Sequence, residues 1–161
     1  MVIHLVRVLS LWLIATATFA GSSQDGVASV FEVRPVGWVR KTAGRTTIEI
    51  DKQYAPALMG IEDIDAIWVL YWFDRNDTPE RRAILQVHPH GNPQNPLRGV
   101  FATRAPVRPN LIALSRCRVL SVHENVIEID DIDAFPDTPV LDIKPYMSGE
   151  RLLGSPSNLE P

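Results

Sequence analysis

Hydrophobic and polar positions along this chain alternate over short segments, and proline or glycine separates most of these segments. Residues 46–50 (TTIEI) alternate, and residues 66–73 (AIWVLYWF) form a continuous apolar run rich in aromatics. Short apolar segments follow at 83–87, 99–103, 111–122, 126–129 and 139–143. Alternation with a period of two and runs of branched or aromatic residues are typical of strands, so the pattern predicts about seven strands.

One window, residues 52–64, has a helical period, because Tyr54, Leu58 and Ile61 share a face, although Gly60 weakens the pattern. One short helix among short strands predicts a mainly β, single-domain fold, either an antiparallel sheet or a small barrel. The run at 66–73 is too uniformly apolar for a half-exposed strand. We therefore expect it at the centre of the sheet, covered on both faces.

The two ends of the chain differ from this globular pattern. Residues 1–20 resemble a secretory signal peptide, because Arg7 precedes an apolar run that ends in small residues before Gly21. The run is shorter than the roughly 20 residues that cross a bilayer, so no stable membrane span is expected after cleavage. The leader predicts an exported protein. We expect residues 21–32 to form a linker and residues 150–161 a flexible tail. The alternative is a mis-called start and a cytoplasmic protein.

Composition limits the possible chemistry. The chain has 161 residues, of which 45% are hydrophobic and 22% charged, and it suits one globular domain. The only cysteine, Cys117, cannot form a disulfide within the chain. Alternation places it on the face of Ala113 and Val119, away from Arg116 and Arg118, so we expect a buried, unreactive thiol.

Several standard site signatures are absent from the sequence, including G-x-G-x-x-G, G-x-x-x-x-G-K-[ST], C-x-x-C and G-x-S-x-G. His88-Pro89-His90 resembles a metal-binding pair, but no second cluster accompanies it, and no metal is predicted. The acidic stretch 124–137 lacks the pattern of a calcium loop. A Rossmann or P-loop nucleotide site is therefore not supported.

An arginine loop remains, in RGVFATRAPVRPN at 98–110, within a chain of net charge −3. Proline stiffens this loop, and guanidinium forks suit carboxylate or phosphate groups. A second stiff loop at 133–139 carries Asp133 and Asp137 on either side of Phe135-Pro136. A cationic loop beside an acidic loop can hold a zwitterion. The alternative is a structural salt-bridge loop that faces the acids of 124–137.

Three strings, YAPALMGIEDIDAIWVLYWFD, GVFATRAPVRPNLIALS and IDAFPDTPVLDIKPY, resemble the TrmO (TsaA-like) family across residues 33–149. This resemblance implies a small antiparallel β-barrel domain at 33–149 that forms a homodimer. It also implies binding of S-adenosylmethionine outside a Rossmann fold. The implied activity is methylation of N6 of the threonylcarbamoylated adenosine beside the anticodon of transfer RNA.

The resemblance also implies site residues. The cofactor-binding residues would be Asp74, Arg104, Leu114, Asp133, Ala134 and Phe135. Arg104 suits the cofactor carboxylate, and Asp133 suits its ribose hydroxyls or amino group. Candidates for substrate binding are Arg98, Arg108 and Asn110, and the catalytic candidates for proton removal are Tyr146, Lys144 and Asp142.

The chain departs from the family pattern at several positions. Between Gly37 and Tyr54 the family usually has a longer loop with a Pro-Arg-Gln string, which is missing here. Family serine, proline, glycine and arginine positions are Ala105, Leu111, Ala113 and His90, and the D-G-T-P turn has become residues 136–139. Two functions therefore stay open: a methyltransferase of transfer RNA, or an exported non-catalytic relative that binds a small anionic or zwitterionic ligand.

Overall fold

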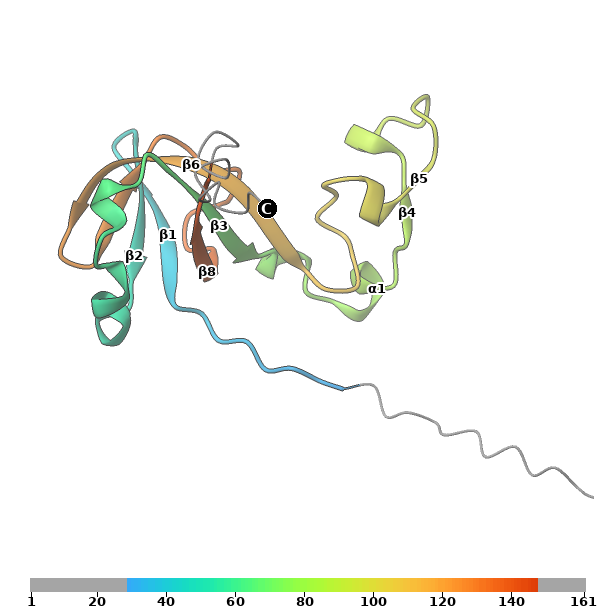
Figure 1. The fold of residues 1–161 in the computed structure, drawn as a ribbon. Coiled ribbons are helices and arrows are strands. Elements are labelled where there is room, and N and C mark those ends of the chain that lie inside the picture. Colours follow the sequence, from blue (N-terminus) through green and yellow to red (C-terminus); the bar gives the residue numbers. More distant parts are fainter. Residues whose placement is uncertain (1–28, 148–161) are drawn as a thin grey trace, which may run out of the picture. The chain divides into compact units, whose positions relative to one another are not determined.

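Six antiparallel strands form a closed barrel in the computed structural model, which describes residues 29–147 (Figure 1). The strands are β1 (Gly37–Thr42), β2 (Arg45–Ile50), β3 (Ala66–Trp72), β6 (Ile112–His123), β7 (Val126–Ile129) and β8 (Pro139–Pro145). Their order around the barrel is β1-β2-β7-β6-β3-β8. The predicted mainly β fold is confirmed. The predicted leader at 1–20 and tail at 150–161 lie outside the described residues.

The barrel interior is filled by alternate residues of each strand, as a pleated sheet closed on itself requires. In β3, Ile67, Val69 and Tyr71 are buried, whereas Trp68 and Trp72 point outward and are only partly covered. The expectation that residues 66–73 would be covered on both faces is therefore wrong. The expectation that this segment lies at the centre of the sheet is confirmed, because β3 pairs with both β6 and β8. Its apolar outer residues had hidden the alternation.

Strand β1 escaped the sequence pattern, although it closes the barrel. It pairs with β2 over its whole length and with β8 only at Gly37 and Trp38. Ala43 and Gly44 connect β1 to β2 with positive φ angles of 51° and 78°, as in a type I′ hairpin turn. A tight hairpin thus lies in the region where the resemblance leads us to expect a longer loop. Gly37 is required by space, because a Cβ there would lie 2.9 Å from the Cα of Ile50.

The window at 52–64 is helical, but it forms two short 3₁₀ helices, η1 (Lys52–Leu58) and η2 (Ile61–Asp63). Pro56 inside η1 has no N–H to donate, and Gly60 adopts φ 83° between the two helices. A continuous α-helix cannot form across these positions. Leu58 and Ile61 are buried against the barrel core, as the spacing predicted.

The segment from 74 to 111 connects β3 to β6 and is made of short elements (Figure 1). They are η3 (Asp74–Asn76), α1 (Pro79–Arg82), β4 (Gln86–Val87), η4 (Pro89–Gly91), β5 (Arg98–Gly99) and η5 (Val100–Ala102). Of the strand predicted at 83–87, only Gln86–Val87 is a strand, and of the strand predicted at 99–103, only Gly99 is, because Val100–Ala102 form η5. In the part of the chain that the structure describes, no helix has the length and apolar character needed to cross a membrane.

Candidate functional site

A pocket of about 780 Å3 lies where the end of β3 meets the arginine loop and the turn at 131–138. Its lining residues are Lys41, Tyr71, Trp72, Phe73, Asp74, Arg75, Asn76, Arg104, Pro106, Asp131, Ile132, Asp133, Ala134, Phe135, Pro136 and Thr138. Segments far apart in the sequence meet here because β3 and β8 are neighbours in the barrel. Five of the six predicted cofactor residues line this one pocket. We call it the barrel-end pocket.

The turn that carries Asp133 is fixed by hydrogen bonds from the barrel. The hydroxyl of Tyr71 donates to the backbone carbonyl of Asp133 at 2.7 Å and lies 3.2 Å from Oγ of Ser115. The ammonium of Lys41 donates to the carbonyl of Ile132 at 2.7 Å. Burial raises the pKa of Tyr71 above its ordinary value, so the hydroxyl keeps its proton. Asp133 is therefore presented on a held backbone.

Arg75 and Phe135 form one wall of the barrel-end pocket. The guanidinium carbon of Arg75 lies 4.1 Å from the centroid of the Phe135 ring, within the range of a cation–π contact. Phe135 is 59% exposed, so its ring is available to a ligand. The contact therefore joins η3 to the turn that carries Asp133.

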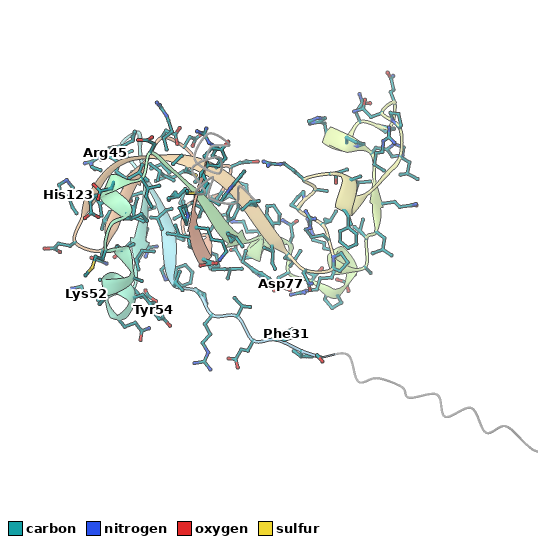
Figure 2. The ribbon with its side chains drawn as sticks, in the orientation of Figure 1. Phe31, Arg45, Lys52, Tyr54, Asp77 and His123 are labelled. Carbon is teal, nitrogen blue, oxygen red and sulfur yellow. The ribbon has the colours of Figure 1, made fainter. Side chains whose placement is uncertain are left out.

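The start of the 74–111 segment is held by a separate polar cluster around Asp77, which is labelled in Figure 2. Asp77 accepts from Nε of Arg82 at 2.8 Å and from Nε1 of Trp72 at 3.0 Å. These two hydrogen bonds, that of Arg82 first, lower the pKa of the Asp77 carboxyl. Nη1 of Arg82 also donates to the carbonyl of Pro109 at 2.9 Å. Arg82 thereby ties α1 to the end of the arginine loop.

Arg104 lies at the centre of the site. It lines the barrel-end pocket and three neighbouring hollows, and Asp133 lines the same four. Within residues 29–147 Arg104 makes no ion pair and no side-chain hydrogen bond. Its guanidinium is therefore available to an anion.

Four of the six acids of 124–137 pair with cations outside the arginine loop. Glu128 pairs with Arg45, which Figure 2 labels, and Asp130 pairs with Arg118; the shortest N–O distances are 2.5 and 3.2 Å. Asp131 pairs with Lys41, and Asp137 pairs with Arg40. In the described part of the chain, none of these acids pairs with Arg98, Arg104 or Arg108. The structure thus differs from the alternative of a salt-bridge loop between 98–110 and 124–137.

The neighbouring hollows hold further predicted residues. One, of about 250 Å3, is lined by Tyr71, Phe73, Thr103, Arg104, Arg108, Ile112, Ala113, Leu114, Ser115 and Asp133. Leu114, the sixth predicted cofactor residue, and Arg108, a predicted substrate residue, both lie here. Another hollow, of about 910 Å3, is bordered by His88 and His90 together with Arg104 and Asp133. The predicted cofactor residues therefore occupy adjoining hollows that share Arg104.

Other predicted site residues lie elsewhere. Arg98 is exposed in β5 and Asn110 is exposed after Pro109, and neither lines the hollows around Arg104. Asp142 and Lys144 pair with each other at 2.7 Å, and Asp142 borders a different, apolar hollow beside η1.

Tyr146 also lies outside the barrel-end pocket. Its ring packs edge-on against Trp68 with centroids 5.4 Å apart. Strand β8 explains the placement of all three catalytic candidates, because it begins beside the pocket, next to Thr138, and then runs away from it.

Several lining residues were not found from the sequence. Tyr71 was counted among the apolar residues of its run, although a hydroxyl at an inward position is a signal for a buried hydrogen bond. Arg75 directly follows the predicted Asp74 and was detectable as a second charge at the strand end. Lys41 had no such signal, because strand β1 itself was missed.

Cys117 is buried, as its position on the same strand face as Ala113 and Val119 predicted. The side chain is fully buried in the core, and burial raises the pKa of the thiol to about 12. The expectation of a buried, unreactive thiol agrees with this burial. No part of the site uses it.

A comparison of the sequence with models of known families identifies the family of this chain. Residues 33–150 match the family model of the tRNA-methyltransferase O N-terminal domain. The chain belongs to this family. The resemblance found in the three sequence strings is thereby confirmed.

The relatives of this chain include two proteins of which it covers more than four fifths. A probable S-adenosyl-L-methionine-binding protein of Methanocaldococcus jannaschii is 43% identical over 115 residues, covering 71% of this chain and 91% of the relative. A protein with the same description from Pyrococcus horikoshii is 48% identical over 114 residues, covering 71% and 81%. The tRNA (adenine(37)-N6)-methyltransferase of Rattus norvegicus is 39% identical over 65% of this chain, which spans 23% of the rat protein.

Solved structures of TrmO share the barrel. The crystal structure of TrmO from Pseudomonas aeruginosa gives a TM-score of 0.57 at 27% identity, covering 83% of this chain and 60% of that chain. Another TrmO crystal structure gives a TM-score of 0.58 at 29% identity, covering 83% and 64%. The chain therefore spans less than two thirds of these TrmO chains, and the predicted TrmO-like fold is confirmed.

Proposed function

We propose that this protein is an S-adenosylmethionine-dependent methyltransferase that modifies an adenosine of transfer RNA. The observation that carries the proposal is the barrel-end pocket, in which a free Arg104 stands beside Asp133 on a turn held by Tyr71. Support also comes from the relatives, whose names describe S-adenosylmethionine binding and methylation of adenine 37 of tRNA.

The residues of the pocket fit S-adenosylmethionine. Its volume of about 780 Å3 lies within the range of small-molecule sites. Arg104 suits the carboxylate of the amino-acid part, because a guanidinium forms paired, charge-assisted hydrogen bonds with carboxylates. Asp133 and Asp74 can accept hydrogen bonds from ribose hydroxyls or from the ammonium group. The rings of Phe73 and Phe135 offer apolar surface to the adenine.

When bound, S-adenosylmethionine would supply an electrophilic methyl group. The chain's own contribution is to hold and orient, because methyl transfer depends mainly on in-line positioning. Tyr71 and Lys41 fix the backbone of the turn at 131–134, so that Asp133 keeps its position.

The transfer also requires a group that removes a proton from the weakly nucleophilic nitrogen. The carboxylate of Asp133 is our choice, because it lines every hollow that adjoins the barrel-end pocket through Arg104; Asp74 then remains to accept the hydrogen bonds of the cofactor. Tyr146, Lys144 and Asp142 remain sequence predictions that lie away from the pocket.

Methyl transfer to transfer RNA tests the proposal directly. Purified protein, tritium-labelled S-adenosylmethionine and transfer RNA bearing threonylcarbamoyladenosine are mixed, and tritium in precipitated RNA is counted. We expect incorporation that depends on protein concentration and is lost in Asp133→Asn. The matched control is Asp63→Asn, an exposed acid on η2 outside the hollows. No incorporation into any transfer RNA, with folded protein and intact cofactor, would contradict the proposal.

A second function is favoured by one observation, the tight β1–β2 hairpin at Ala43-Gly44. The resemblance leads us to expect a longer loop between Gly37 and Tyr54, and the hairpin would leave less of the chain to enclose a cofactor. The second candidate is an exported, non-catalytic module that binds a small anionic or zwitterionic ligand at Arg104. It differs from the first in predicting no affinity for RNA.

We also propose a homodimer. Its support is the apolar surface of the 74–111 segment, where Leu85, Leu97 and Phe101 are 59%, 52% and 81% exposed. Large exposed apolar side chains on one segment are typical of interaction surfaces. Light scattering after gel filtration should give twice the mass of one chain for the native protein. The Phe101→Glu variant should give the mass of one chain. A monomeric native protein would refute the homodimer.

Export remains a proposal that rests on residues 1–20. The leader predicts a mature N-terminus near Gly21, whereas modification of transfer RNA requires a cytoplasmic pool. N-terminal sequencing of protein isolated from each cell fraction decides between them: a terminus near Gly21 in the exported fraction supports export, and an intact terminus in the cytoplasm refutes it.

A further inference from the structure

Nine of the eleven arginines within residues 29–147 fall into two groups. Arg40, Arg45, Arg82 and Arg118 pair with carboxylates on or beside the barrel. A second group has no carboxylate partner and no side-chain hydrogen bond within residues 29–147: Arg75, Arg98, Arg104, Arg108 and Arg116. The first group stabilises the fold, and the second group keeps its charge available.

Four of the free arginines converge on one place. Arg75 shares the barrel-end pocket with Arg104, and Arg108 shares the hollow at Leu114 with it. Arg116 shares with Arg104 a further hollow of about 360 Å3, which is also lined by Trp68, Ser115, Asp130, Asp131, Ile132 and Asp133. Arg104 thus shares hollows with three more guanidinium groups that lack a carboxylate partner, although the net charge of the chain is −3.

Positive charges outnumber unpaired negative charges in the hollows around Arg104. The carboxylates that line these hollows are Asp74, Asp130, Asp131 and Asp133. Asp130 and Asp131 are already paired with Arg118 and Lys41. Two carboxylates therefore stand against four guanidinium groups.

A zwitterionic cofactor has one carboxylate and accounts for one guanidinium, that of Arg104. Arg75 is engaged with the ring of Phe135 at 4.1 Å. Arg108 has no ring contact, whereas Arg116 lies 4.4 Å from the centroid of the Tyr146 ring. Neither Arg108 nor Arg116 lines the barrel-end pocket, so both remain for an anion other than the cofactor.

The positions of these two arginines narrow the choice of anion. The hollow of Arg108 and the hollow of Arg116 have Arg104, Ser115 and Asp133 in common. Arg108 and Arg116 therefore line two separate hollows that adjoin at Arg104 and Asp133. A nucleotide within a chain carries one phosphate on its 5′ side and another on its 3′ side, so its two phosphates match this arrangement. A free nucleoside has neither.

Aromatic side chains accompany Arg116. Its guanidinium carbon lies 4.4 Å from the centroid of the Tyr146 ring, and Tyr146 packs against Trp68. Aromatic faces beside arginines are the platforms on which proteins stack unpaired bases. Tyr146, which lies away from the cofactor pocket, thereby gains a role in holding a base next to the modified one.

We propose that Arg108 and Arg116 bind the two phosphates that flank the methyl-accepting nucleotide, with Tyr146 as a stacking surface for its neighbour. The inference rests on the proposed function and deepens it, because it requires a polynucleotide substrate rather than a nucleoside. It also assigns the phosphate contacts to Arg108 in the arginine loop and Arg116 in β6.

The test measures RNA binding without methyl transfer. Fluorescence anisotropy follows a fluorescein-labelled anticodon stem-loop RNA titrated with full-length protein at several potassium chloride concentrations. Each phosphate contact releases counterions, so Arg108→Gln and Arg116→Gln should each reduce the slope of log K against log[salt] by about 0.7 to 0.9. Arg108→Lys, which keeps the charge, should keep the slope.

The matched control is Lys52→Gln, which removes one exposed positive charge on η1 (Figure 2) and lines none of the hollows. Its salt slope should equal that of the native protein. Calorimetric titration of S-adenosylmethionine is carried out on the same variants, and its affinity should stay unchanged in all of them.

The outcomes separate the two claims. Reduced slopes with unchanged cofactor affinity support the phosphate contacts. Native-like slopes in both glutamine variants, or an RNA affinity that does not depend on salt, would overturn them even if the cofactor binds. A native protein that binds RNA with the expected slopes but never binds S-adenosylmethionine would contradict the proposed function and leave the two phosphate contacts standing.

Discussion

The substitution Arg104→Ala should weaken S-adenosylmethionine binding strongly and leave the stability of the barrel nearly unchanged. Among residues 29–147 Arg104 has no ion pair and no side-chain hydrogen bond, and it is exposed. Its removal therefore leaves no buried group without a partner. We expect the free energy of unfolding to change by no more than about 0.5 kcal/mol, as for other surface substitutions.

The loss of binding follows from the contact that Arg104 would make with the cofactor carboxylate. A hydrogen bond to a charged group contributes about 1.5 to 3 kcal/mol. Since about 1.4 kcal/mol corresponds to a factor of ten, the dissociation constant should rise about 10- to 150-fold. Calorimetric titration measures this change, and thermal melting followed by circular dichroism measures stability.

Arg82 offers a matched control, because it is an arginine of the same segment with a structural role. It pairs with Asp77, donates to the carbonyl of Pro109 and lies 5.2 Å from the ring centroid of Trp72. Arg82→Ala should cost about 1 to 3 kcal/mol of stability, with the partly exposed ion pair contributing least. Its cofactor affinity should stay close to native, since Arg82 lines none of the hollows around Arg104.

The reasoning would be refuted in two ways. A loss of stability in Arg104→Ala as large as that in Arg82→Ala would show that Arg104 is a structural residue. An unchanged dissociation constant in folded Arg104→Ala would show that the cofactor carboxylate binds elsewhere.

Three further predictions concern single groups. Tyr71→Phe removes the hydrogen bond to the Asp133 carbonyl; unfolding by urea should show a loss of about 0.5 to 1.5 kcal/mol, and calorimetry should show weaker cofactor binding. Gly37→Ala should destabilise the barrel by about 1 to 3 kcal/mol in the same assay, because a Cβ would collide with the carbonyl of Glu49. Cys117, whose thiol pKa burial raises to about 12, should react with iodoacetamide at neutral pH at least about tenfold more slowly in the native than in the unfolded protein.

Each of these has a clear contrary result. For Tyr71, native cofactor affinity together with lost stability would show that the Asp133 turn does not need the hydroxyl. For Gly37, the control is Gly99→Ala, where a Cβ would meet only the Leu85 carbonyl at 4.0 Å; equal effects would contradict the steric account. For Cys117, equal alkylation rates in the two states would mean that the core opens readily.

Much of the barrel was predictable from the sequence, because its strands show either alternation or dense apolar runs. The exceptions have physical causes. Strand β1 has Gly37 at an inward position, and its other residues include Arg40 and Lys41, so the apolar signal is weak. The helix at 52–64 became two 3₁₀ helices because Pro56 and Gly60 interrupt it.

The site was predictable only as far as the family strings reach. These strings identified Arg104 and the turn at Asp133, which the structure brings into one pocket. They did not identify Tyr71, whose role depends on a hydrogen bond between β3 and a distant turn. They placed Asp142, Lys144 and Tyr146 near the chemistry, whereas the direction of β8 carries these residues away from the pocket. Spacing along a chain does not show in which direction a strand leaves a site.

Calorimetric titration of S-adenosylmethionine into purified residues 21–161 tests the central claim most directly. The account predicts saturable binding of one cofactor per chain, with a dissociation constant in the micromolar range that Arg104→Ala raises and Arg82→Ala does not. The absence of heat up to millimolar cofactor, in protein that melts cooperatively, would contradict the account. The barrel would then be a binding module for a different anionic or zwitterionic ligand.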